Sequence, residues 1–178
     1  YSRRFILGDS VIRRKITLGT EWTRHSIRPN VINTEGLIAQ LLESSSTKER
    51  IANELAVHAS YQWEPAPRLS VTAGIRNSGA IVHGKVYFNA EPRFSTRYTL
   101  RKDQALKFSY ARMAQYIHRI SNSAVTTPTD IWYPVTDTIR AQTSHQFALG
   151  WQRSLQPGRV FISAEGYFKT MENLIGYR

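Results

Sequence analysis

The chain has 178 residues, of which 41% are apolar and 21% are charged, values that fit one folded domain and exclude wholesale disorder. The net charge is +11, but the basic residues are spread along the chain rather than gathered into patches, which argues against nucleic-acid binding. Cysteine is absent, so disulfides, thiolate metal sites and thiol nucleophiles are excluded, and no apolar run reaches the roughly 18 residues of a transmembrane helix.

Alternation of apolar and polar residues, which is typical of strands with two different faces, dominates the first half of the chain. It predicts a short strand near 3–8 and longer strands at 13–26, 54–63 and 69–76. The segment EPAPR at 64–68 predicts a tight turn between the last two. Helical spacing is found only in GLIAQLLE at 36–43, where one or two helical turns are predicted.

The same alternation continues in the second half and predicts strands at 93–99, 105–111, 145–152 and 160–169. In the second of these, Leu106 and Phe108 share one face while Lys107 and Ser109 share the other. The chain is therefore predicted to be all-β and antiparallel, with about eight strands in a single domain.

The predicted connections fall into two length classes. Short turns are expected at 64–68, 100–104 and 153–159, and long links at 27–50, 77–88 and 112–143. Sorting of short turns and long loops is typical of outer-membrane β-barrels, whose periplasmic turns are short and whose extracellular loops are long. A soluble sandwich has no reason to sort its loops in this way.

Three architectures bury one face of such a sheet: a soluble sandwich, a soluble closed barrel with an apolar interior, and a membrane barrel with an apolar exterior. The polar faces are rich in serine, threonine, glutamine and charge, which suits a wet lumen. The apolar faces carry rings near strand ends, as an interfacial girdle requires: Trp22, Tyr61, Trp63, Tyr110, Trp151 and Phe168. The pattern favours the membrane barrel, with the two soluble folds as alternatives.

Several motifs resemble the C-terminal part of the barrel of TonB-dependent outer-membrane receptors, most closely those with a carboxypeptidase-like N-terminal extension. The matching segments are SYAR-x-x-QY at Ser109–Tyr116, TPTD-x-W-x-P at Thr127–Pro134, Q-x-S-x-Q at Gln142–Gln146, and EGYFK with M-x-N-L-I at Glu165–Ile175. The upstream strands TLGTEWTRHSIRPN and EPRFSTRYTL are also similar to that family.

The resemblance implies a 22-stranded barrel, filled by a plug, in the outer membrane of a Gram-negative bacterium. It also implies import of a scarce solute, such as a siderophore, a cobalamin or a glycan, with energy relayed by TonB. Residues 1–178 would form part of this barrel, and the plug that contacts the TonB complex would lie outside them. Expected partners are outer-membrane lipid, the solute and, in the glycan-importing branch, a surface lipoprotein lid. Alternative functions are a soluble carbohydrate-binding β-sandwich and a small structural outer-membrane barrel.

No catalytic or cofactor motif is recognisable. The histidines lack the H-x-x-x-H and H-E-x-x-H spacings, and G-x-S-x-G and the phosphate-binding glycine motifs are absent. We therefore expect no enzyme, no metal and no cofactor. Solute contacts are expected from loop residues, unless these only pack the loops against each other: Tyr116, His118, Asn122, Trp132 and Tyr133. Four basic residues are expected to face the lumen, where they would hold plug carboxylates or attract an anionic solute: Arg76, Arg93, Arg97 and Lys107.

Overall fold

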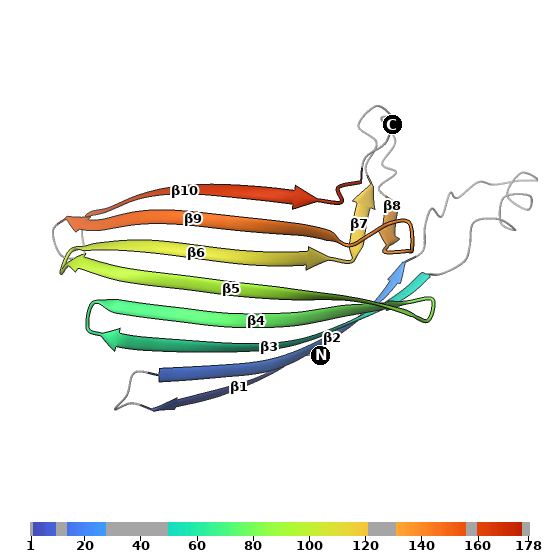
Figure 1. Cartoon of the computed structure of the whole chain (residues 1–178), viewed down its shortest axis with the longest axis horizontal. Coiled ribbons are helices and arrows are strands. Elements are labelled where there is room, and N and C mark those ends of the chain that lie inside the picture. The colour runs from blue at the N-terminus through green and yellow to red at the C-terminus, as the bar shows by residue number, and fades with distance from the viewer. Residues whose placement is uncertain (1, 10–13, 28–49, 121–130, 156–159, 176–178) are drawn as a thin grey trace, which may run out of the picture.

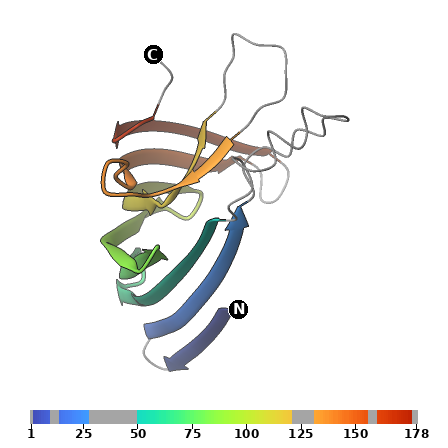
Figure 2. The ribbon, with the colours of Figure 1, turned by 90° about the vertical axis from the view of Figure 1, so that its right-hand side faces the viewer.

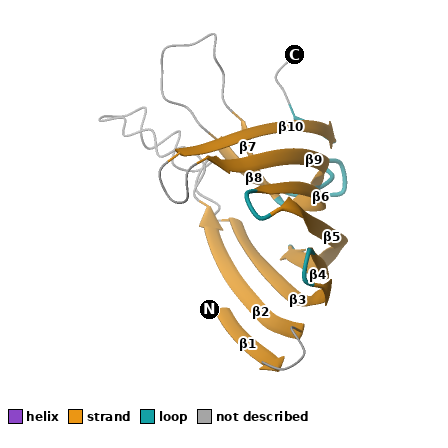
Figure 3. Cartoon of the chain, turned by 90° about the vertical axis from the view of Figure 1, so that its left-hand side faces the viewer, coloured by secondary structure: helices purple, strands orange, loops and turns teal. Residues whose placement is uncertain are grey.

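A computed structural model describes residues 2–9, 14–27, 50–120, 131–155 and 160–175. These residues form strands and their connections, without a helix (Figure 3). The described part of the chain therefore holds no helix long and apolar enough to cross a membrane. The prediction of helical turns at 36–43 lies outside the described residues.

The described strands are β1 (Ser2–Asp9), β2 (Arg14–Ile27), β3 (Arg50–Ala66), β4 (Leu69–Val82), β5 (Lys85–Arg101), β6 (Gln104–Gln115), β7 (Ile117–Ile120), β8 (Ile131–Pro134), β9 (Gln142–Leu155) and β10 (Val160–Glu172). Eight of them form one antiparallel sheet in the order β1-β2-β3-β4-β5-β6-β9-β10 (Figure 1). A separate hairpin is formed by β7 and β8, which lie between β6 and β9 in the sequence. The predicted all-β antiparallel fold, with about eight strands in its sheet, is confirmed.

The pairing register sorts the side chains into continuous rows across the sheet. One row of paired residues is almost entirely apolar: Tyr61, Ala73, Phe94, Tyr110, Phe147 and Phe168. The neighbouring row, which faces the other way, is polar or small: Ser60, Gly74, Arg93, Ala111, Gln146 and Lys169. Because side chains alternate faces along every strand, this register gives the whole sheet one apolar face and one polar face.

The sheet curves into an arc (Figures 2 and 3), and the β7–β8 hairpin lies on its concave side. The polar face is the concave one, which we call the inner face, and the apolar face is the outer face. Large apolar side chains on the outer face remain uncovered: Leu55 is 53% exposed, Leu149 61% and Phe168 65%. A soluble sandwich would cover these residues with a second sheet, and the described residues contain no such layer.

The long link predicted at 77–88 is wrong. β4 continues to Val82 and β5 starts at Lys85, so only two residues join them. These residues, His83 and Gly84, both have positive φ angles, of 49° and 78°, as a tight hairpin turn requires. The alternation was obscured here because Ala80 and Val82 place apolar groups on the otherwise polar inner face.

The segment predicted as a long loop at 112–143 is partly ordered into strands. β6 extends to Gln115, and the β7–β8 hairpin follows. Beyond the pair Arg93–Ala111, β5 and β6 no longer pair, while β6 remains bonded to β9. The sheet therefore splits along one side of β5, and the hairpin leaves the wall at this split.

We expect a charge on the outer face to destabilise the fold in lipid, whereas the same charge on the inner face should be tolerated. Leu149→Arg in the complete protein, reconstituted in lipid vesicles, should lower the free energy of unfolding by about 2–4 kcal/mol, because the guanidinium would enter hydrocarbon. The matched control is Tyr167→Arg, at an exposed inner-face position of the neighbouring strand β10. Equal effects in urea unfolding would contradict the orientation of the sheet.

Candidate functional site

The β7–β8 hairpin and the residues after it pack on an apolar patch of the inner face. Tyr116 and Val135 contact Ala52, Ala80 and Val82, and all five are buried. The Val135 N–H donates a hydrogen bond to the Tyr116 carbonyl, with an N–O distance of 2.9 Å. This contact explains the apolar residues on the inner face, because burying them beneath the hairpin removes them from water.

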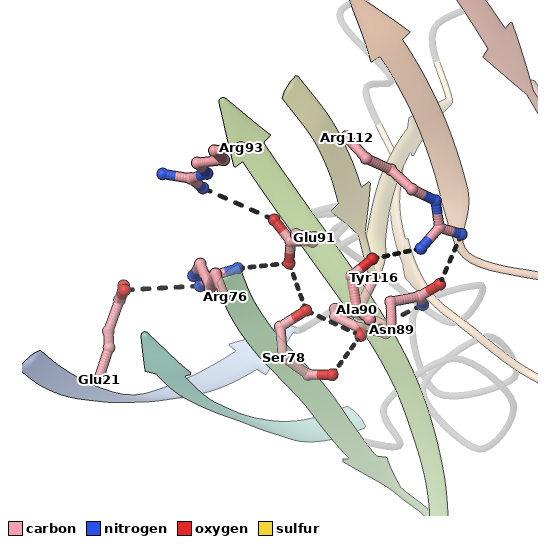
Figure 4. A network of polar contacts seen from close by, with 9 residues as sticks. All are labelled: Glu21, Arg76, Ser78, Asn89, Ala90, Glu91, Arg93, Arg112 and Tyr116. Atoms are coloured by element: carbon pink, nitrogen blue, oxygen red, sulfur yellow. Dashed lines mark hydrogen bonds and ion pairs between the residues drawn. The ribbon is translucent and has the colours of Figure 1, made fainter. Parts of the chain in front are cut away.

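The Tyr116 hydroxyl connects the hairpin to the wall. It donates to the Ser78 carbonyl oxygen at 2.8 Å, lies 3.0 Å from the Ser78 Oγ, and accepts from the Asn89 amide nitrogen at 3.2 Å (Figure 4). These partners come from β4 and β5, so a single side chain ties the chain after β6 to two neighbouring strands. A buried hydroxyl with this many partners is costly to displace.

A buried carboxylate lies next to this tyrosine. Glu91, only 2% exposed, accepts a hydrogen bond from the Ser78 Oγ at 2.5 Å and one from the Arg76 guanidinium at 2.8 Å. A second guanidinium, that of Arg93, lies 3.7 Å from its other oxygen (Figure 4). We call Glu91 with Ser78, Arg76 and Arg93 the Glu91 network. The two cations provide the charge compensation that a buried carboxylate requires.

Arg112 occupies the split between β5 and β6. Its guanidinium donates to the Ala90 carbonyl oxygen and lies 3.4 Å from the Asn89 side-chain oxygen (Figure 4). The carbonyl belongs to a stretch of β5 that has lost its partner strand on this side. Arg112 therefore satisfies a backbone acceptor that the sheet leaves unpaired.

The segment after β8 is also fixed at the rim. Asp137 accepts hydrogen bonds from the Lys85 ammonium and, at 3.1 Å, from the Tyr87 hydroxyl. Both partners lie at the start of β5, beside the tight turn at His83–Gly84. The hairpin is thus attached at its base by Tyr116 and Val135 and at the rim by Asp137.

A hollow of about 640 Å³ opens between the hairpin and the inner face. The lining comes from the ends of β2 and β6, from β3 and β4, and from the hairpin with the residue before it. The residues that line the hollow are Arg24, His25, Ser26, Ile27, Glu54, Arg76, Ala114, Gln115, Tyr116, Ile117 and Trp132. The His25 Nε2 lies 3.7 Å from a Glu54 carboxylate oxygen. The volume falls within the range of about 300–1,000 Å³ of small-molecule sites, and an indole, a carboxylate and guanidinium groups supply both stacking and polar contacts.

The loop residues predicted to contact solute are in different environments. Trp132 lines the hollow and is 47% exposed, and Tyr116 lines it while also anchoring the hairpin. His118 is 1% exposed and does not line it, Tyr133 is half-buried, and Asn122 lies outside the described residues. Contact of any of them with a solute stays a prediction.

The four predicted lumen-facing cations lie on the inner face, in two distinct settings. Arg76 and Arg93 belong to the Glu91 network, and Arg76 also lies 3.5 Å from Glu21. Arg97 and Lys107 lie opposite each other on β5 and β6, without an ion pair among the described residues. Whether any of the four holds a plug carboxylate stays a prediction.

Sequence reasoning missed Glu91, Ser78 and Glu54 as site residues. Glu91 and Ser78 lie in or next to the stretch wrongly assigned to a long link. Had β4 and β5 been continued to their tight turn, the register would have placed Arg76 opposite Glu91. Across the described ranges, no cluster of three or more histidine and acidic side chains could hold a metal ion.

The geometry defines a piece of a curved membrane-barrel wall with an inward-folded loop. The sequence matches the family described as "TonB dependent receptor-like, beta-barrel" over residues 2–178. The chain belongs to the TonB-dependent receptor β-barrel family, whose members are outer-membrane receptors and transporters of Gram-negative bacteria rather than enzymes.

Among solved structures, the chain is similar to a mutant ferric enterobactin receptor from Pseudomonas aeruginosa, in complex with enterobactin. The TM-score is 0.56 and the sequence identity 17%, with 87% of this chain and 24% of the receptor chain covered. This likeness shows a shared fold, and the chain spans only 24% of the length of that receptor. No significant match is found among curated protein sequences.

Removing the Tyr116 hydroxyl should loosen the hairpin. Tyr116→Phe removes the hydrogen bonds that the hydroxyl makes with the Ser78 carbonyl and the Asn89 amide, which costs about 1–3 kcal/mol for buried groups. We expect faster tryptic cleavage at the exposed Arg119 in the complete receptor. Tyr98→Phe, on the outer face, is the control and should leave the cleavage rate unchanged. Unchanged cleavage in Tyr116→Phe would show that the hydroxyl does not anchor the hairpin.

Acidification should release the hairpin through His118. Burial lowers the pKa of this imidazole below its usual 6.5 and outweighs the opposite effect of the Arg140 backbone. Because the folded-state pKa is depressed, the docked hairpin is fully stable above about pH 6.5 and loses stability as the pH falls below that value. Amide hydrogen exchange of β7, corrected for intrinsic pH dependence, should accelerate below pH 6.5. His118→Gln should abolish this acceleration, and an identical pH response in the variant would contradict it.

Proposed function

We propose that this chain forms part of the wall of a TonB-dependent receptor that captures a scarce solute outside the cell and imports it across the outer membrane. The observation that carries the proposal is the hollow between the β7–β8 hairpin and the inner face. It lies at the end of the barrel where the longer connections gather, so a solute arriving from outside would meet it before the rest of the wall.

The solute is expected to be a ferric siderophore, a cobalamin or a glycan, since all three present flat or ring-shaped faces that can stack on an indole such as that of Trp132. Import would require a plug outside residues 1–178, through which the TonB complex would act on the solute site. Partners would also include outer-membrane lipid around the outer face and, for a glycan importer, a surface lipoprotein lid.

Import can be tested in the source bacterium by deleting the gene and measuring uptake of labelled ferric siderophores, cobalamin and oligosaccharides. Uptake of one class should be lost in the deletion strain and in a strain without TonB. If all three classes enter normally without the gene, the import function is wrong. Recovery of the protein only in detergent extracts of the outer membrane would separate it from a soluble sugar-binding protein.

The hollow is tested by complementing the deletion with Trp132→Ala. Removal of an aromatic binding contact worth about 2 kcal/mol should raise the half-saturating solute concentration by more than about tenfold. Trp151→Ala is the matched control, because this tryptophan lies on β9 in an apolar row of the outer face, away from the hollow. If both variants transport with unchanged half-saturation, the solute does not bind at this hollow.

A further inference from the structure

Two neighbouring short turns of the sheet carry positive charge that the wall does not compensate. Arg68 lies in the turn between β3 and β4, and Arg101 and Lys102 lie at the turn between β5 and β6. Both turns are at the end of the sheet opposite the β7–β8 hairpin (Figure 1). All three side chains are exposed, and none forms an ion pair within the described ranges. We call Arg68, Arg101 and Lys102 the basic rim.

Backbone hydrogen bonds join these turns to the adjacent strand ends. The Thr99 N–H donates to the Arg68 carbonyl oxygen, with an N–O distance of 2.7 Å. The Ser154 N–H donates to the Asp103 carbonyl oxygen at 2.8 Å. The β3–β4 turn therefore adjoins the end of β5, and the β5–β6 turn adjoins the end of β9. The cations of the basic rim thus lie on one continuous stretch of the sheet edge.

The acidic residues near the basic rim are directed elsewhere. Asp103, which follows Lys102 in the same turn, accepts a hydrogen bond from the Arg153 guanidinium at 3.0 Å. Glu64 alternates with Trp63 along β3 and therefore belongs to the inner face. The outer side of the rim is left with a net positive charge, which attracts an anion.

The depth of the basic rim corresponds to the headgroup layer of a bilayer. Tyr98, Leu106 and Trp151 form a paired row on the outer face, and the two aromatic rings mark the edge of the hydrocarbon. Arg101 follows Tyr98 by three residues, which is about 10 Å along the strand and about 8 Å along the axis of a barrel with strands tilted by about 40°. The headgroup layer on each side of a bilayer is about 5–8 Å thick. The basic rim therefore lies at the level of the lipid phosphates.

We propose that the basic rim binds the phosphate of an anionic phospholipid in the periplasmic leaflet of the outer membrane. The inference deepens the proposed function, on which it rests, by naming the class of lipid that this edge of the wall selects. The phosphate would accept charge-assisted hydrogen bonds from Arg101 and Lys102, and the acyl chains would lie along the apolar outer face. A zwitterionic lipid would also need an anion for its ammonium group, and the nearby Asp103 is already bonded to Arg153.

Native mass spectrometry of the complete protein in detergent tests this selection. The probes are phosphatidylglycerol and phosphatidylcholine with identical acyl chains, because only phosphatidylglycerol carries a net negative charge. We expect the wild-type protein to retain phosphatidylglycerol preferentially. The double substitution Arg101→Gln with Lys102→Gln should weaken binding of phosphatidylglycerol by about fivefold for each cation removed, and should leave binding of phosphatidylcholine unchanged.

The matched control is Arg97→Gln with Lys107→Gln. It removes the same charge from the same two strands, but on the inner face, which lipid does not reach, and should keep the preference. Arg101→Lys with Lys102→Arg retains both charges and should also keep it. If the Arg101→Gln, Lys102→Gln protein does not fold, Arg68→Gln gives the same readout with about a fivefold loss.

Three results would overturn the inference. Equal retention of the two lipids by the wild-type protein would show that charge does not select the lipid. An unchanged preference after substitution of the rim, or the same loss in the inner-face control, would show that the basic rim is not the site. Stronger displacement of phosphatidylglycerol by inorganic phosphate than by chloride at equal ionic strength would assign the rim to free phosphate.

The proposed function fails separately from this inference. Lipid selection is measured on the purified protein without a solute, whereas import is measured by uptake in the deletion strain. A protein that selects phosphatidylglycerol but is not needed for uptake of any solute class would retain the lipid site and lose the receptor function. A protein that imports a solute and binds the two lipids equally would lose only the lipid site.

Discussion

The structure depends on an unbroken register of antiparallel strand pairs. Side chains alternate between the two faces along each strand, and the register keeps this alternation in step across all eight strands of the sheet. A slip of one residue at any pair would move every apolar side chain beyond that pair to the other face. The apolar row from Tyr61 to Phe168 and the polar row from Ser60 to Lys169 exist only while all five pairings between them hold. Separation of the two faces is therefore a property of the whole sheet rather than of single strands.

The inner face departs from this rule where the chain folds back on it. Ala52, Ala80 and Val82 replace polar groups there, and Tyr116 and Val135 cover them. A wall that was polar throughout could bind a returning loop only by hydrogen bonds, which water competes for. The apolar patch lets the hairpin bury apolar side chains away from water. The hydrogen bonds of the Tyr116 hydroxyl fix where on the wall the hairpin lies. The residues of the wall beneath the hairpin therefore determine where the hairpin packs.

Charge on the inner face is handled in two ways. Glu91 is buried and compensated by two guanidinium groups, which makes the Glu91 network a fixed part of the wall. Arg97 and Lys107 face each other across β5 and β6, and Glu165 of β10 lines the same hollow without a close ion pair to either of them.

The sequence by itself determined the strand period, the sorting of side chains to two faces and the family, because alternation and the motifs around Ser109–Tyr116 and Thr127–Pro134 are local in the chain. The prediction from the sequence was wrong at 77–88, because apolar residues on the inner face obscure the alternation there. The roles of Ser78 and of the Arg76–Glu91 pair were therefore not predicted. Only the tertiary structure placed Tyr116 against β4 and β5. That contact joins residues 38 positions apart through a chain reversal, and no local pattern encodes which side of a wall a loop will cover.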